Sequence, residues 1–445
     1  MHTKSKKLGI FASSAIVAGN MMGSGIALLP SNLAAIGSLT FISWIIASIG
    51  AIGLAFVFAK LSATDPQEGG PVAYAGEVAP ILGFQSGVLY FNANWIGNLA
   101  IAITGVAYLS TFFPELNNPI YAGIATIIII WIFTAINFFG ASWVGRLVSI
   151  GVVLLLIPII LTATVGWFFF SSETFINNWN VTHSSNIHGI FSGVLLCVWS
   201  FIGVESASVN TNLVKNPRKT IPLATIIGVS IAAIVYFLSC TVISGIFKSD
   251  VVAHSGAPFS LVSSFMFGNW AGKAVSIIVA FACLASLSSW MMLTAQAGAR
   301  ASHDGSLPKI FGELNKNDIP VKGLIVTSSG MTLLMLVVML GSGSTAALFG
   351  KVISIAVMMT ILPYFYSALN LIDVVEHPVK HFVLTVVAIV AILFCFIAYI
   401  GAEDYALVSV TIISLITMIF YVRKDREDFE KRVYKDVHHW QIKGD

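Results

Sequence analysis

Long apolar runs follow one another along almost the whole chain, and they decide what it can fold into. A membrane-spanning helix needs about 20 consecutive apolar residues. Only 10% of the 445 residues are charged and 57% are hydrophobic, whereas about a quarter of a soluble domain is charged. Twelve runs cover approximately residues 8–29, 39–61, 83–113, 119–139, 144–170, 187–209, 221–247, 270–298, 321–340, 347–371, 382–400 and 405–422. The sequence therefore predicts an all-α membrane protein with twelve transmembrane helices.

The basic residues predict the orientation of these helices. Loops rich in Lys and Arg stay on the cytoplasmic side of a membrane. With a cytoplasmic N-terminus, the inner side receives Lys4, Lys6, Lys7, Arg146, Lys215, Arg218, Lys219, Arg300, Lys309, Lys316 and Lys322. Only Lys248, Lys273 and Lys351 fall outside or near the outer end. We expect both termini in the cytoplasm, with a basic arm at 1–7 and a charged tail at 423–445.

Two of the runs contain residues that interrupt a helix. The first holds Gly23, Ser24 and Gly25 at its middle, with Pro30 expected to close it, and the sixth holds the stretch 203–206. Glycine weakens a helix by roughly 1 kcal/mol relative to alanine. Interrupted segments at matching positions of two halves point to a transporter's binding site near the bilayer midplane, although small residues also serve close helix crossings.

Breaks in the first and sixth helices predict an inverted repeat of five helices. Helices 1 to 6 then occupy residues 8–209, which is the first repeat plus the broken sixth helix. Helices 7 to 10 occupy 210–371, and helices 11 and 12 occupy 372–422.

Glu205 is the one acidic residue that these runs place at membrane depth. A charge at the centre of a spanning helix costs on the order of 3 kcal/mol, so such a residue usually has a function. No Lys or Arg is assigned to the same depth. We therefore expect a positively charged substrate, and we expect transport to depend on pH because burial favours the neutral carboxyl.

Polar and aromatic side chains accompany Glu205. Tyr90, Asn94 and Asn98 are four residues apart and share one helix face, where they either line a site or bond to other helices. Trp199 and Trp290 offer aromatic faces that hold ammonium groups, although helical aromatic residues also serve as plain core.

The interruptions themselves supply binding groups. The break in the first helix exposes backbone N–H groups able to hold a carboxylate. The free carbonyls around Trp199 and Ile202 can accept bonds from an α-ammonium group. Together these groups describe a site for a cationic amino acid, and a diamine would use all but the first set.

Four further residues are expected at a gate or vestibule, namely Tyr74, Glu77, Asp304 and Tyr364. Each has a plainer alternative. Glu77 suits a helix start, Asp304 can pair with Arg300 across one helical turn, and Tyr364 suits the aromatic belt at the interface. The four cysteines and the nine histidines suggest no metal site. Nothing in the sequence points to a cofactor or to nucleic acid. We do not expect an enzyme.

The sequence resembles those of the basic amino acid/polyamine antiporters of the amino acid/polyamine/organocation superfamily. The similarity covers essentially the whole chain and rests on Gly23-Ser24-Gly25, on the stretch from Trp199 to Ala207 and on Asn216-Pro217. The stretches 19–30, 69–77 and 93–98 are most similar to members that exchange lysine for cadaverine. Asn94 and Ala356 stand where arginine/agmatine relatives carry cysteine and serine.

The resemblance implies uptake of lysine in exchange for cadaverine at a bacterial inner membrane, by a homodimer. It also implies coupling to an intracellular lysine decarboxylase and a contribution to acid resistance, with Glu205 as a pH-sensitive gate residue. The residues expected around the substrate are Met21, Gly23, Ser24, Gly25, Tyr90, Ala93, Asn94, Asn98, Trp199, Ile202, Glu205 and Trp290. Arginine/agmatine exchange, ornithine/putrescine exchange, proton-coupled import and a channel remain alternatives.

Overall fold

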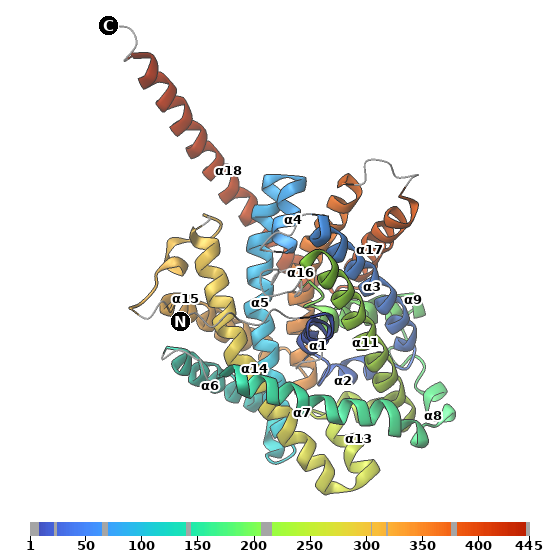
Figure 1. Cartoon of the computed structure of the whole chain (residues 1–445). Helices are drawn as coiled ribbons and strands as arrows, with labels where there is room; N and C mark the ends of the chain where they lie inside the picture. The colour runs from blue at the N-terminus through green and yellow to red at the C-terminus, as the bar shows by residue number, and fades with distance from the viewer. Residues whose placement is uncertain are drawn as a thin grey trace.

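The computed structural model describes residues 9–21, 25–64, 70–138, 144–205, 216–303, 305–316, 319–374 and 381–441. Regular secondary structure in these ranges is entirely helical (Figure 1). The longer helices are α1 (Ile10–Met21), α3 (Thr40–Thr64), α5 (Pro80–Leu109), α6 (Pro119–Asn137), α7 (Val144–Val165), α9 (Asn186–Phe201), α11 (Pro217–Ile246), α13 (Pro258–Phe267), α14 (Asn269–His303), α15 (Val321–Leu340), α16 (Thr345–Val374), α17 (Phe382–Ile400) and α18 (Asp404–Gln441). Shorter helices are α2 (Leu29–Ala34), α4 (Pro71–Val78), α8 (Ser172–Asn177) and α12 (Ser249–Ala253), with 3₁₀ turns η1 (Pro114–Asn117), η2 (Gly166–Phe169) and η4 (Lys309–Gly312). The all-α expectation is confirmed for the described residues.

Nine helices in the described part of the chain are long and apolar enough to cross a membrane. They correspond to nine of the twelve expected runs. The other three expected runs are the first, the third and the sixth. The third run forms α5, which has 30 residues but carries Asn92, Asn94 and Asn98 in its middle, and these lower its mean hydropathy.

Both expected interruptions are non-helical where the structure describes them. α1 ends at Met21, residues 25–28 form turns and α2 begins at Leu29. α9 ends at Phe201 and residues 202–205 form turns, with Gly203 at φ +104°. That backbone conformation favours glycine because it has no Cβ. Residues 22–24 and 206–215 lie outside the description.

Pro30 does not close the first span, contrary to expectation. It lies in the first turn of α2, which continues to Ala34. Proline is well tolerated at the start of a helix because its missing N–H would have no partner there and its φ suits the helix. In the described residues, the region of the first run therefore contains two short helices, α1 and α2.

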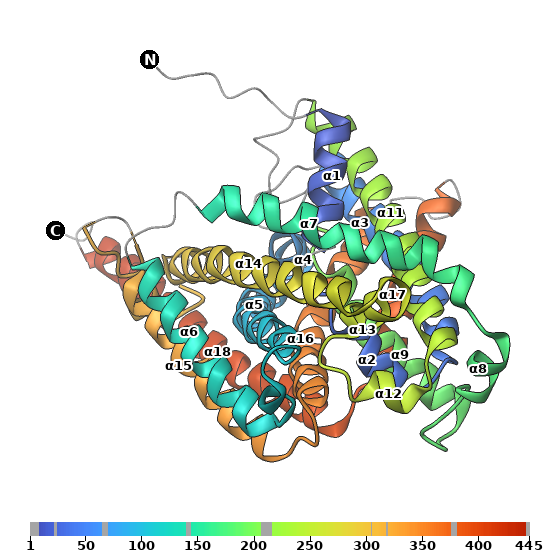
Figure 2. The same ribbon diagram turned by 90° about the horizontal axis from the view of Figure 1, so that it is seen from below.

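The helices that carry the polar and aromatic residues lie at the centre of the bundle. α5 packs against α14 and α16, and α3 packs against α11, while α6 and α15 lie together at one side (Figures 1 and 2). In the most apolar stretch of α16, 78% of the residues are buried, compared with 28% in α6. α6 and α16 thus differ sharply in how much of them the rest of the protein covers.

The connection between α8 and α9 holds the start of α3 in place next to α2. The backbone N–H groups of Ser38 and Leu39 donate to the carbonyls of Asn178 and Trp179, at 2.8 and 2.9 Å. Gly37 has φ +125°, and a Cβ at this position would lie 2.6 Å from both carbonyl oxygens. Only glycine fits this close approach, which fixes the segment between α2 and α3.

The last helix is longer than the expected span. α18 runs without a break from Asp404 to Gln441 and extends beyond the rest of the bundle in Figure 1. The backbone of the expected tail therefore continues the helix of the twelfth apolar run through Gln441.

Candidate functional site

Glu205 lies in the turn that follows α9 and is 2% exposed. Tyr90 donates its hydroxyl hydrogen to Oε1. Tyr364 donates to Oε2 at 2.6 Å, and the Gly203 N–H donates to the same oxygen at 3.2 Å. Hydrogen bonds to a charged group contribute about 1.5–3 kcal/mol each, so these three donors offset part of the cost of burying the carboxylate. We call Glu205, Tyr90, Tyr364 and Gly203 the carboxylate cluster.

Three different elements build the carboxylate cluster. Tyr90 comes from α5, Tyr364 from α16, and Gly203 and Glu205 from the turn that follows α9. The positive φ of Gly203 turns the chain so that its own N–H faces the Glu205 carboxylate two residues later. The carboxylate thus joins two long helices to a helix break, and its displacement would loosen all three.

A row of aromatic rings leads from the carboxylate cluster toward α4. The rings of Tyr364 and Phe58 lie 5.4 Å apart, and those of Phe58 and Tyr74 lie 6.4 Å apart. The hydroxyls of Tyr74 and Ser62 are 3.0 Å apart. Edge-to-face and tilted pairs at this separation are favourable, so a shift of Tyr364 would be felt at Tyr74.

Glu77 lies at the end of this row, on the exposed side of α4. The Asn370 side-chain amide donates to Glu77 Oε2 at 2.5 Å and to the Tyr74 carbonyl at 3.1 Å. The helix-start alternative for Glu77 is wrong, because Glu77 lies in the last turn of α4. Its bond to Asn370 ties α4 to α16. Asp304, the fourth expected vestibule residue, lies outside the described residues.

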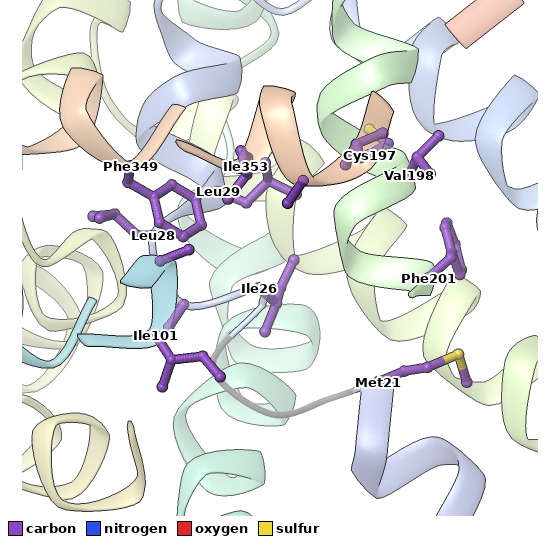
Figure 3. Close-up of a cluster of buried hydrophobic side chains, with 14 of the residues drawn as sticks. Met21, Ile26, Leu28, Leu29, Ile101, Cys197, Val198, Phe201, Phe349 and Ile353 are labelled. Atoms are coloured by element: carbon purple, nitrogen blue, oxygen red, sulfur yellow. The ribbon is translucent and has the colours of Figure 1, made fainter. Parts of the chain in front are cut away.

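The break in the first span lies among side chains of α5, α9 and α16. Figure 3 shows Met21 at the end of α1 and Ile26 on the other side of the break. Around them it shows Leu28, Leu29, Ile101, Cys197, Val198, Phe201, Phe349 and Ile353. Of the binding residues expected at this break, Met21 is buried and Gly25 is half-buried, while Gly23 and Ser24 lie outside the description.

Trp199 lies directly against this break. A methyl group added to Gly25 would be 3.4 Å from Trp199 Nε1 and 3.8 Å from the Met21 carbonyl oxygen. A methyl group on Gly97 of α5 would be 3.2 Å from Trp199 Cη2. Small residues at both positions leave room for the indole, whose enclosed N–H finds no acceptor among the described residues.

The remaining expected residues lie on α5, on α14 and directly after α9. Asn94 donates to the Tyr90 carbonyl of its own helix at 2.8 Å, and Asn98 donates to Thr294 of α14 at 3.1 Å. Ala93 on α5 is buried, and Trp290 is half-buried on α14. The N–H of Ile202, the residue that follows α9, donates to the Trp199 carbonyl at 3.3 Å, so that carbonyl already accepts a hydrogen bond.

Sequence reasoning missed the partners that hold these residues. Phe58, Asn370 and Thr294 contact Tyr364, Glu77 and Asn98, respectively. Phe349 lies edge-on to Trp199 with ring centroids 6.3 Å apart. Asn370 alone carried a visible signal, as an amide at the end of an apolar run.

Among the described residues, no group of three or more His, Cys, Asp and Glu could hold a metal ion.

Comparison with known proteins identifies relatives along nearly the whole chain. A cadaverine/lysine antiporter of Escherichia coli K12 is 52% identical over 428 residues, which is 96% of each chain. A putrescine transporter of the same organism, PotE, is 34% identical over 426 residues, covering 94% of this chain and 96% of the relative. PotE of Haemophilus influenzae is 32% identical over 426 residues, covering 95% and 98%. The family model described as amino acid permease matches residues 8–422. The chain is therefore a multi-pass membrane protein that belongs to the amino acid permease family.

Proposed function

We propose that this protein is an antiporter that exchanges external lysine for internal cadaverine. The observation that carries the proposal is the 52% identity, over 96% of both chains, to a cadaverine/lysine antiporter. A buried carboxylate in the turn that follows α9 supports it, because both cargo molecules are cations.

Glu205 is the proposed countercharge for the substrate. An arriving ammonium group competes for the carboxylate oxygens that accept from Tyr90 and Tyr364. When those bonds break, α5 and α16 are no longer held together at the turn after α9. Substrate binding would in this way release the gate on the inner side of the site.

The break in the first span is the proposed site for the backbone groups of lysine. Amides at Ser24 and Gly25 would hold the carboxylate, and the Met21 carbonyl would accept from the α-ammonium group. Cadaverine has no carboxylate and would leave those amides unused. This difference supplies separate binding modes for the two exchange partners at one site.

The remaining lining residues would enclose the alkyl chain and the second ammonium group. Trp199 and Trp290 offer ring faces for a cation–π contact, and Ala93, Asn94, Asn98 and Ile202 fill the space between them. Gly23 would keep the first break accessible. Tyr74, Glu77, Asp304 and Tyr364 are the proposed gate and vestibule residues on the cytoplasmic side.

The proposed architecture has twelve spans with an inverted five-helix repeat, in which helices 1 and 6 are the broken pair. Both termini lie in the cytoplasm, the membrane is a bacterial inner membrane and the protein forms a homodimer. This count divides the spans into helices 1 to 6 at residues 8–209, helices 7 to 10 at 210–371, and helices 11 and 12 at 372–422. The protein is not an enzyme in this proposal.

Coupling to a lysine decarboxylase gives the exchange its physiological use. Decarboxylation consumes a proton, and the exported diamine carries one more positive charge than the lysine that enters. The cycle therefore removes acid from the cytoplasm, which is the proposed contribution to acid resistance.

Counterflow in proteoliposomes tests the proposal. Labelled lysine should enter vesicles that contain unlabelled cadaverine or lysine and should not enter empty vesicles. Equal uptake by empty vesicles would refute antiport. A competition series of lysine, arginine, ornithine and their decarboxylated amines separates the proposed pair from ornithine/putrescine exchange, which the 34% identity to a putrescine transporter makes the second candidate.

A further inference from the structure

Asn98 and Thr294 form a polar contact between two helices beside the proposed site. The Asn98 side-chain N–H donates to the Thr294 hydroxyl oxygen at 3.1 Å. Both side chains are 2% exposed. A buried contact of this kind is costly to break, because the donor left behind loses its partner.

Thr294 differs from most other buried threonines of the spans. Thr104, Thr126 and Thr360 each donate to the backbone carbonyl four residues earlier, at 2.9, 2.7 and 3.0 Å. In the described part of the chain, the Thr294 hydroxyl makes its hydrogen bond to another helix instead. Its oxygen thus fixes a side chain of α5 rather than satisfying its own backbone.

The packing of α5 against α14 sets Asn98 opposite Thr294. A methyl group on Gly298 would lie 2.6 Å from the Phe91 ring, and one on Gly105 would lie 3.2 Å from Leu284. The two helices are therefore antiparallel, with Asn98 opposite Thr294. Trp290 lies one turn away from Thr294 on the same face of α14, and Gly97, next to Asn98, contacts the Trp199 ring.

The contact with Thr294 determines which end of the Asn98 amide remains available. The N–H group is used, while Oδ1 accepts no hydrogen bond from the described residues and is not one of their enclosed, unpartnered atoms. Asn137 is different, because its Oδ1 is enclosed and without a partner. Asn98 thus keeps a buried acceptor oxygen that no described residue uses.

An unused acceptor oxygen suits an ammonium group, which has three donors and no acceptor. A rotated amide would present its own donors and would repel the same group. We infer that Thr294 is a positioning residue that holds Asn98 with Oδ1 toward the side-chain ammonium of the substrate, and so favours an ammonium tail over a hydroxyl tail. This inference rests on the proposed function and deepens it.

The test compares lysine with 2-amino-6-hydroxyhexanoic acid, whose hydroxyl tail both donates and accepts. In reconstituted vesicles, Thr294→Val should raise the apparent KM for lysine about tenfold, with the maximal rate per transporter within about twofold of the unaltered protein. The preference for lysine over the hydroxyl analogue should fall by a similar factor. This ratio does not depend on how much protein folds.

Two further variants separate positioning from general packing. Thr294→Ser keeps the hydroxyl and should restore both KM and preference to within about twofold. Thr104→Val, on α5 and bonded only to its own helix, should change neither. An unchanged preference in Thr294→Val, or a Thr294→Ser variant as impaired as Thr294→Val, would overturn the inference.

The outcomes also distinguish this inference from the proposed function. If the unaltered protein does not exchange lysine for cadaverine, the proposed function is refuted. If the unaltered protein exchanges them and Thr294→Val keeps the full preference for lysine, only the role of Thr294 is refuted.

Discussion

Replacing Glu205 with glutamine tests the central electrostatic argument. The substitution keeps the size of the side chain and removes its charge. Two unit charges about 4 Å apart attract by about 4 kcal/mol at an effective dielectric constant near 20. Part of this is offset because the substrate ammonium must lose water to reach the site.

The net loss of substrate affinity on removing the charge is better taken from hydrogen bonds to charged groups. These contribute about 1.5–3 kcal/mol, or roughly 10- to 150-fold in affinity. Glutamine also has one acceptor oxygen where three donors from Tyr90, Tyr364 and Gly203 converge. We therefore expect the apparent KM for lysine and for cadaverine to rise by this factor in Glu205→Gln. The pH dependence of exchange should largely disappear.

Initial rates of lysine/cadaverine exchange in proteoliposomes, measured across the acidic and neutral range, provide the assay. Glu173→Gln is the matched control, because Glu173 is an exposed residue in the first turn of α8. Glu205→Asp keeps the charge but shortens the side chain, so it should retain pH dependence while losing contact with the tyrosines. An unchanged KM and an unchanged pH profile in Glu205→Gln would refute the assigned role.

Three further substitutions test the surroundings of the carboxylate. Tyr364→Phe removes a donor that competes with the substrate for Oε2, so both the apparent KM for lysine and the maximal exchange rate should fall several-fold; a higher KM would contradict the competition. Gly25→Ala places a methyl group 3.4 Å from Trp199 Nε1 and should raise the KM a few-fold, whereas Gly9→Ala, with nothing within 4 Å, should not. Trp290→Leu should raise the KM for lysine by about two- to thirtyfold through loss of a cation–π contact. An unchanged KM would show that the Trp290 ring does not contact the substrate.

The apolar runs were sufficient to predict the helices, because a span must be long and apolar whatever it packs against. The runs 321–340 and 382–400 coincide with α15 and α17. Glu205 and the two interruptions were also recognisable, since a charge or a glycine pair inside such a run is costly. The error at Pro30 arose because proline both ends and begins helices, and the sequence alone did not separate the two uses.

Contacts between spans could not be predicted in the same way. Tyr364 reaches Glu205 across 159 positions of sequence and Thr294 reaches Asn98 across 196. Neither partner has a local signature, because one hydroxyl on an apolar helix looks the same whether it bonds to its own backbone or to another helix. Only the packing of α5 against α14 and α16 distinguishes these cases.

The spans that fall short of the length or hydropathy of a membrane helix are those that carry most of the proposed site. α5 contributes Tyr90, Asn94 and Asn98, the first span is divided into α1 and α2, and α9 ends at Phe201 before Glu205. Binding a cation requires acceptors, and acceptors lower hydropathy or interrupt a helix.

α16 is the exception. It is long and apolar enough to cross a membrane, and its apolar stretch is 78% buried, yet it supplies Tyr364. A tyrosine hydroxyl adds one polar atom at the tip of an apolar ring, so a proposed gate residue such as Tyr364 leaves little mark on the hydropathy of its helix. A search for gates in related chains should therefore start from tyrosines in highly buried spans rather than from breaks alone.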